Sequence, residues 1–201
     1  LGSANHRLGN LDLAEQYTKK AIELEPYEAD HHEHIGFIYL SKGNLEMANK
    51  EFRFAIDELG HAHSHAYRGL AQLNYLKENY KESIRYYNKA LEIQPHFLDI
   101  HLGLSRAYIR EKDYSKAKEI LEKALTISDK NAQVYLMLSF VYYKLNELES
   151  ADLMMSKALS LSNNPGSSIP SFSECMGNIG NNYTVENVAR CIEASMSQNK
   201  Y

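Results

Sequence analysis

A period of about 34 residues runs through most of the chain and constrains its fold more than any other feature. Its clearest marker is an alanine in similar surroundings, as in KKAIEL, NKALEI and EKALTI. Successive copies lie 34 or 35 residues apart, and they are Ala21, Ala55, Ala90, Ala124 and Ala158. A fixed period of this length is typical of stacked repeats, in which each unit buries one face against the next.

Each unit is predicted to consist of two helices separated by a polar turn. In the second helix of the third unit, Ile84 and Tyr87 recur at helical spacing, while Lys81 and Arg85 lie on the opposite side. This pattern is typical of a surface helix with one buried face. Polar breaks such as residues 42–44 separate the two helices of a unit. The sequence therefore predicts an all-α fold.

The repeat pattern resembles that of the tetratricopeptide repeat (TPR) family. The second unit carries this pattern in Ile35, Gly36, Tyr39, Ala48, Phe52 and Ala55. His32 and His101 stand where the family has an aromatic residue. The resemblance implies a right-handed superhelical solenoid of helix–turn–helix TPR repeats, whose first helices line a concave groove. Residues 1–165 hold five such units, and the first begins inside its own first helix, so we expect it to be truncated at its N-terminus.

The sequence changes character after residue 165. Residues 166–183 are rich in Ser, Asn and Gly and are predicted to form a linker. Thr184 is a candidate cap for a helix over residues 184–201, in which Val188 and Ile192 recur at helical spacing. We expect this C-terminal helical tail to cap the last repeat. The alternative is that it folds into the groove or docks on another chain.

The resemblance also implies a binding surface, because inward-facing positions of the family's first helices contact its partners. These positions combine apolar and aromatic residues with arginines, a mixture that often dominates binding hot spots. They are Glu33, Phe37, Leu40, Arg68, Gln72, Tyr75, Leu102, Arg106, Ile109, Arg110, Leu136, Phe140 and Tyr143. We expect a groove for an apolar segment with acidic flanks. The alternative is that several of these residues pack against neighbouring helices.

Histidine is the most unusual feature of the composition. Six of the nine histidines form two clusters, His31, His32 and His34, and His61, His63 and His65. With Asp30 and Glu33 nearby, they could bind zinc or nickel or make association depend on pH. Their spacing matches no defined ligand motif, so no residue is predicted as a metal ligand. The alternative is solvated turns, with His32 filling an aromatic packing position.

Charge and hydropathy limit the classes of partner. The net charge of −4 provides no positive field, which disfavours nucleic acid as a partner. No apolar run approaches the roughly 18–20 residues that a membrane span requires, so no membrane insertion is expected. Cys175 and Cys191 leave both a disulfide and reduced thiols open. Because the state of these cysteines is open, the sequence does not assign a cellular compartment, although the cytoplasm is slightly favoured over the periplasm or export.

The sequence thus predicts a non-catalytic scaffold or adaptor that binds a protein or peptide segment in the TPR groove. An extended surface suits chemistry poorly, because catalysis needs several groups converging on one atom. No cofactor is expected, since Gly177 and Gly180 lack the context of a phosphate-binding loop. Alternative functions are a metal- or pH-responsive module built on the histidines and the recognition arm of a larger enzyme. Open repeat ends would also allow homo-oligomerisation.

Overall fold

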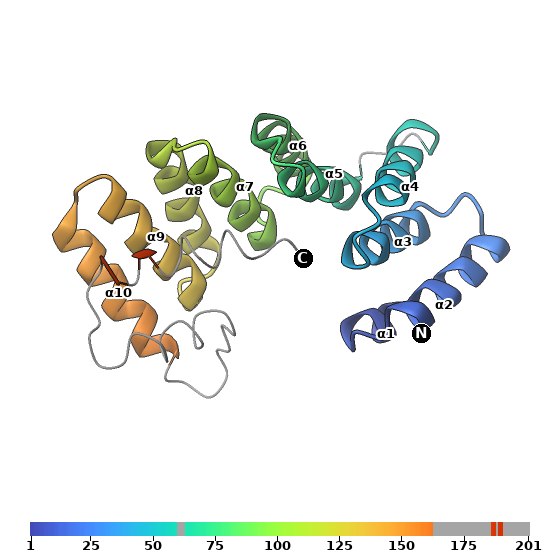
Figure 1. Ribbon diagram of the computed structural model, residues 1–201, viewed down its shortest axis with the longest axis horizontal. Helices are drawn as coiled ribbons and strands as arrows, with labels where there is room; N and C mark the ends of the chain where they lie inside the picture. Colours follow the sequence, from blue (N-terminus) through green and yellow to red (C-terminus); the bar gives the residue numbers. More distant parts are fainter. Residues whose placement is uncertain (60–62, 163–185, 188, 191–201) are drawn as a thin grey trace. The chain divides into compact units, whose positions relative to one another are not determined.

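A computed structural model describes residues 1–59, 63–162, 186, 187, 189 and 190 (Figure 1). Within these residues the secondary structure is helical and contains no strand, which confirms the prediction of an all-α fold. The helices are α1 (Gly2–Arg7), α2 (Leu11–Leu24), α3 (Ala29–Ser41), α4 (Leu45–Asp57), α5 (Ser64–Leu76), α6 (Tyr80–Ile93), α7 (Leu98–Arg110), α8 (Tyr114–Ile127), α9 (Ala132–Lys144) and α10 (Leu148–Ser162).

Consecutive helices pack as pairs, each an odd-numbered first helix followed by an even-numbered second helix (Figure 1). The chain divides into two compact units. Unit 1 spans Leu1–Pro95 and holds α1 to α6, and unit 2 begins at His96 and holds α7 to α10. Within each unit, a second helix also packs on the first helix of the next pair, as α4 does on α5 and α8 on α9. This is the helix–turn–helix stacking that the period predicted.

The marker alanines lie where second helices meet their neighbours. Ala55, Ala90, Ala124 and Ala158 have no exposed surface, whereas Ala21 on α2 is only partly buried. The first helices of the later pairs have 13 residues, but α1 has six. In the second pair, His32 at the start of α3 packs against Phe54 near the end of α4. Because α1 lacks the corresponding turns, the end of α2 is less covered.

The turns inside the helix pairs share one backbone conformation. A residue with positive φ recurs at the repeat period, as Gly9 and Gly43 (77° and 74°) and as Glu78, Lys112 and Asn146 (62°, 61° and 61°). Side-chain caps follow at two of these turns, where Asn44 accepts from the Met47 N–H at 3.2 Å and Asp113 from the Lys116 N–H at 3.2 Å. Such caps satisfy amide groups that the first helical turn leaves unpaired.

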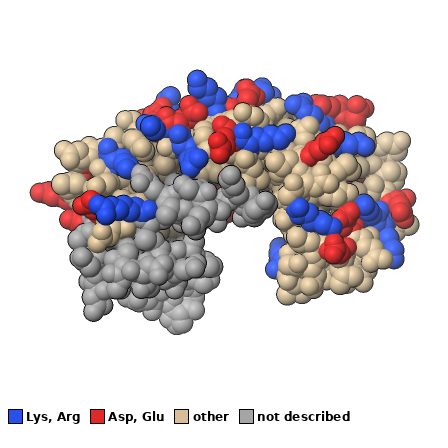
Figure 2. All heavy atoms as spheres, in the orientation of Figure 1, with Lys and Arg blue, Asp and Glu red and all other residues tan. Residues whose placement is uncertain are grey.

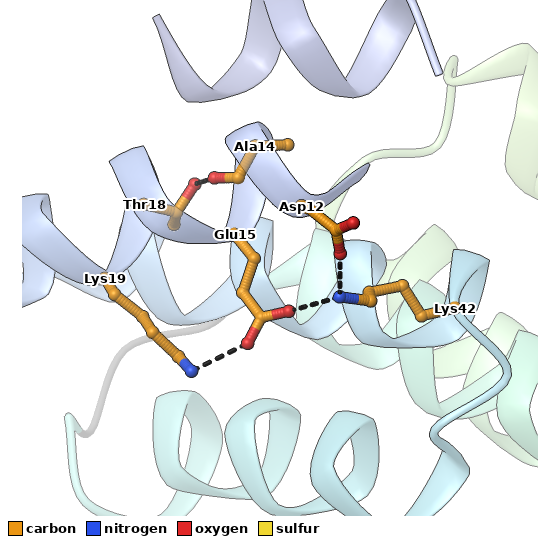
Figure 3. A network of polar contacts seen from close by, with 6 residues as sticks. All are labelled: Asp12, Ala14, Glu15, Thr18, Lys19 and Lys42. Atoms are coloured by element: carbon orange, nitrogen blue, oxygen red, sulfur yellow. Dashed lines mark hydrogen bonds and ion pairs between the residues drawn. The ribbon is translucent and has the colours of Figure 1, made fainter. Parts of the chain in front are cut away.

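A polar network joins α2 to the end of α3 (Figure 3). The Lys42 ammonium lies 2.6 Å from Asp12 Oδ1 and 2.7 Å from Glu15 Oε2, and Lys19 lies 2.6 Å from Glu15 Oε1. Hydrogen bonds from Lys19 and Lys42 lower the pKa of Glu15. Thr18 Oγ1 donates to the Ala14 carbonyl at 2.8 Å, so this buried hydroxyl is also satisfied. The network sets the first helix pair against the second.

Unit 2 has one continuous apolar core drawn from all four of its helices. Its fully buried members include Leu121, Leu138 and Val141. Ala189 also belongs to this core, so part of the C-terminal segment packs on unit 2. Residues 186, 187, 189 and 190 are helical, while the rest of the predicted 184–201 tail and the 166–183 linker lie outside the described residues. None of the described helices has the length and apolar character needed to cross a bilayer.

Candidate functional site

In unit 1, the predicted groove residues come from the first helices α3 and α5. Glu33 and Leu40 are buried, whereas Phe37 is half-buried. On α5, Arg68, Gln72 and Tyr75 are half-buried as well, and these three residues follow one another at helical spacing. Four of the six predicted residues of unit 1 therefore reach the surface.

The centre of this surface is a cation–π pair. The Arg68 guanidinium lies 4.4 Å from the centroid of the Phe37 ring. The same ring meets the buried Phe52 edge-on, with centroids 5.0 Å apart, which fixes its position from below. Tyr75, about two turns beyond Arg68 on α5, packs edge-on against Tyr80 with ring centroids 5.4 Å apart. An arginine and two aromatic rings are thus held in defined positions at the surface of two neighbouring first helices, α3 and α5.

In unit 2, the predicted residues divide into buried and half-exposed groups. The apolar group, Leu102, Ile109, Leu136 and Phe140, retains 2% to 7% exposure and belongs to the core. The second group is half-buried and consists of Arg106, Arg110 and Tyr143. The Lys144 ammonium lies 5.8 Å from the Tyr143 ring centroid and adds a further cation to this face. Packing is therefore the observed role of the four apolar residues, and partner binding at the second group stays a prediction.

Glu33 forms a buried junction between the second and third helix pairs. Its side chain projects from α3, and its Oε1 accepts a hydrogen bond from the Ala66 N–H of α5 at 3.2 Å. The Nδ1 atoms of His63 and His65 lie 3.3 and 3.6 Å from its two oxygens. Burial raises the pKa of Glu33 to about 7, with Asp30 adding to the rise, while the Ala66 N–H and Arg68 act in the opposite direction.

The histidines of the first cluster point to three separate places. His31 Nε2 lies 3.2 Å from Oε2 of Glu25, the C-cap residue of α2. His32 is buried, contacts Glu51 at 2.8 Å and the Pro26 carbonyl at 2.9 Å, and packs against the Phe54 ring at a tilt, with centroids 4.5 Å apart. The expectation that His32 fills an aromatic packing position is thus confirmed.

His34 packs instead against His6 of α1, with ring centroids 5.4 Å apart. Burial, followed by the nearby His6, lowers the pKa of His34. Of the second cluster, His63 and His65 meet at Glu33, and His61 lies outside the described residues. Among the residues that the structure describes, no group of three or more His, Cys, Asp and Glu is arranged to hold a metal ion.

Sequence reasoning assigned Glu33 to the groove and also placed it near the histidines as a possible metal or pH-responsive group. It did not predict that Glu33 would be buried, accept a hydrogen bond from the Ala66 N–H and meet His63 and His65. The signal was the repeat register, because Glu33 lies two residues before Ile35, at a position that faces the start of the next first helix. The later pairs carry Arg68, Leu102 and Leu136 at that position, so within the described part of the chain Glu33 is the buried acid.

Three profiles described as tetratricopeptide repeat match the chain and together cover residues 1–28 and 36–165. One matches residues 74–124 and 109–165, the second residues 36–96, and the third residues 1–28. The chain belongs to the tetratricopeptide repeat family. Members of this family are typically non-catalytic scaffolds, and membership supports a role in protein–protein interaction.

Solved TPR structures resemble the chain at low sequence identity. Pseudomonas aeruginosa PilF is 20% identical, with a TM-score of 0.76, and the match covers 100% of this chain and 85% of that one. MamA from Desulfovibrio magneticus RS-1 is 17% identical, with a TM-score of 0.70 and coverages of 83% and 93%. YrrB, described as a TPR protein with an unusual peptide-binding site, is 18% identical, with a TM-score of 0.63 and coverages of 82% and 84%.

These likenesses concern the fold, which the chain shares with all three proteins. No curated protein matches the sequence.

Proposed function

We propose that the chain is a non-catalytic scaffold that binds a polypeptide segment along its first helices. The observation that carries this proposal is the Arg68–Phe37 pair, in which a half-buried guanidinium is held 4.4 Å from a half-buried ring. Arginine and aromatic residues contribute disproportionately to binding energy when a partner covers them. Because Phe37 is fixed from below by Phe52, little side-chain entropy would be lost on binding.

The chemistry of this surface favours a segment that carries both an apolar and an acidic side chain. The Phe37 and Tyr75 rings offer apolar contact area, while Arg68 offers a planar donor for a carboxylate. In unit 2, Arg106 and Arg110 supply the same donor chemistry on α7. On the face seen in Figure 2, cationic and anionic side chains are interspersed, so recognition would depend on these local groups and not on a field of one sign.

The YrrB neighbour supports a peptide as partner, because YrrB is described as a TPR protein with an unusual peptide-binding site. The proposal does not include Leu102, Ile109, Leu136 or Phe140, whose burial leaves little surface for a partner. In each unit it rests on the half-buried residues of that unit's own first helices.

The test starts from peptides selected on the immobilised chain from a random displayed library. The affinity of each selected peptide is then measured by fluorescence anisotropy for the wild type and for Arg68→Glu and Arg106→Glu. The control is Arg53→Glu, which makes the same change of charge on the exposed side of the second helix α4. We expect a loss of about tenfold or more, or roughly 1.4 kcal/mol, for at least one of the two first-helix variants.

The control should change the affinity by less than about twofold. If all three variants weaken peptide binding equally, the change in net charge explains the lower affinity, and a site on the first helices is contradicted. Selection of no peptide, or full affinity in both first-helix variants, would contradict the proposal as well.

A further inference from the structure

Glu33 caps the start of α5 from a neighbouring helix. His63 occupies the N-cap position of α5, yet its side chain makes no capping hydrogen bond. The Glu33 carboxyl group accepts from the Ala66 N–H in its place, at 3.2 Å and with only 5% of the residue exposed. A carboxylate near a helix N-terminus stabilises the first turn through the exposed N–H groups and the helix dipole. Here that stabilisation depends on α3 and α5 remaining packed together.

The two histidine contacts tie this junction to protonation. Glu33, His63 and His65 carry no net charge when the three share one acidic proton, either as a neutral carboxyl group or as a carboxylate beside one imidazolium. Removing that proton leaves a buried anion, and adding another leaves excess positive charge near Arg68. Uncompensated charge in a buried place is unfavourable. We propose that Glu33, His63 and His65 form a proton-dependent latch between α3 and α5, which is tightest when the three side chains share one acidic proton.

Charged groups of opposite sign lie around the latch. Asp30 of α3 and Arg68 of α5 both act on Glu33, with opposite signs. On α4, which also packs against α3, Glu51 is engaged by His32 at 2.8 Å. The net charge of the latch is therefore set by the protonation of Glu33, His63 and His65 themselves. The raised pKa of Glu33 agrees with this arrangement, as does the pKa of His65, which burial lowers.

The sign of the pH dependence follows from these two shifts. The pKa of Glu33 is raised from 4.5 to about 7, so its contribution to stability is complete below about pH 4.5 and is lost as the pH rises through about 7. The pKa of His65 is lowered from 6.5, so its contribution is present above that value and is lost at more acidic pH. Opening at neutral to alkaline pH thus depends on Glu33.

The latch also bears on the proposed binding surface. Phe37 follows Glu33 by one turn of α3, and Arg68 belongs to the second turn of α5, so their cation–π pair lies beside the latch. A looser α3–α5 junction would displace the two halves of that pair. This consequence rests on the proposed function, whereas the latch itself does not.

The direct test is an NMR titration of the Ala66 amide proton in the full chain, from about pH 5.5 to about pH 8.5. An amide that donates to a carboxyl group reports the ionisation of that group through its chemical shift. The wild type is compared with Glu33→Gln, which keeps an acceptor oxygen but removes the titration, and with Glu46→Gln at an exposed position of α4. We expect a step with a midpoint near 7 in the wild type and in Glu46→Gln, and none in Glu33→Gln.

Thermal unfolding over the same range gives an independent result. We expect the melting temperature of the wild type to fall between about pH 6 and about pH 8, and Glu33→Gln to reduce that fall by at least about half. A flat Ala66 titration in the wild type, or an unchanged step in Glu33→Gln, would overturn the latch.

Peptide-binding measurements distinguish a failure of the latch from a failure of the proposed function. Peptides that require Arg68 should bind the wild type with an affinity that changes around pH 7, and Glu33→Gln with a weaker dependence. The Ala66 titration needs no peptide, so a failed selection would contradict the proposed function alone. A failed titration would contradict the latch even if peptides bind.

Discussion

The Phe52 ring of α4 packs directly against Gly69 of α5, where the second helix pair meets the third. The ring has no exposed surface, and a Cβ atom on Gly69 would overlap three of its carbon atoms. Gly36 of α3 faces the same ring, since a Cβ atom there would lie 2.6 Å from Phe52 Cε1. A phenylalanine at this position of the repeat therefore requires a residue without a side chain on each flanking helix.

Replacing Gly69 by alanine should destabilise the chain even though alanine is the better helix former. The helical preference for alanine is about 1 kcal/mol, whereas overpacking a closed core costs about 1–3 kcal/mol, so we expect a net loss in Gly69→Ala. Urea unfolding measures the difference. The double variant with Phe52→Leu should lose less than the sum of the single variants, because the smaller side chain provides room. A Gly69→Ala chain as stable as the wild type would contradict this packing.

Relief of backbone strain should stabilise the turn between α7 and α8. Lys112 is exposed and adopts a φ of 61°, a left-handed conformation that costs a non-glycine residue about 1–2 kcal/mol. Glycine removes this strain but loses more entropy on folding, so Lys112→Gly should gain about 0.5 kcal/mol in free energy of unfolding.

The same turn in the other helix pairs provides the controls for this prediction. Asn146→Gly should change stability less, since asparagine tolerates positive φ. Gly43→Ala should lose about 1 kcal/mol. If Lys112→Gly unfolds at a lower urea concentration than the wild type, then strain is not the dominant effect at this turn.

His101 should make unit 2 less stable in acid. Burial, opposed by a 3.2 Å hydrogen bond to the Phe97 carbonyl, lowers the pKa of this histidine. The unfolded chain therefore takes up a proton below about pH 6.5 more readily than the folded chain, and stability falls as the pH drops through the folded pKa of His101.

His101→Phe should remove this pH dependence, because phenylalanine has no titrating group. It also restores the aromatic residue that the family pattern favours at this position. The measurement compares thermal unfolding of His101→Phe and wild type at about pH 7.5 and about pH 5. The variant should lose less stability between the two values. Equal losses would assign the acid sensitivity of the chain to other groups, such as His34 and His65 of unit 1, whose pKa values burial also lowers.

The repeat register could be predicted from the sequence because packing imposes it directly. A small residue is needed wherever two helices approach closely, so Ala55 and Ala124 recur at one position and are fully buried. The same logic accounts for the all-α class and for the positions of the turns. Ala21 shows the limit of prediction from the repeat register, since the partial exposure of Ala21 depends on the length of α1 and not on the repeat position of the alanine.

Side-chain exposure at the candidate site could not be predicted in the same way, because it depends on which neighbouring side chains cover each residue. Phe37 and Phe140 occupy the same position of the repeat, yet Phe37 is half-buried and Phe140 retains 2% exposure. Arg68 lies against Phe37, whereas Phe140 is enclosed by the core of unit 2. Likewise, the sequence identified the histidine clusters, but only the packing of α3 on α5 brings His63 to Glu33.

This difference in burial predicts which substitutions change folding and which can report on binding. Phe140→Ala removes a buried ring and should cost about 3–5 kcal/mol. Arg106→Ala changes a half-buried side chain for which the structure shows no close ionic partner among the described residues, and should cost within about 0.5 kcal/mol. Urea unfolding of the two variants measures the contrast. Comparable costs would mean that Arg106 has a structural role on α7, and its charge reversal could then no longer serve as a probe of the binding surface.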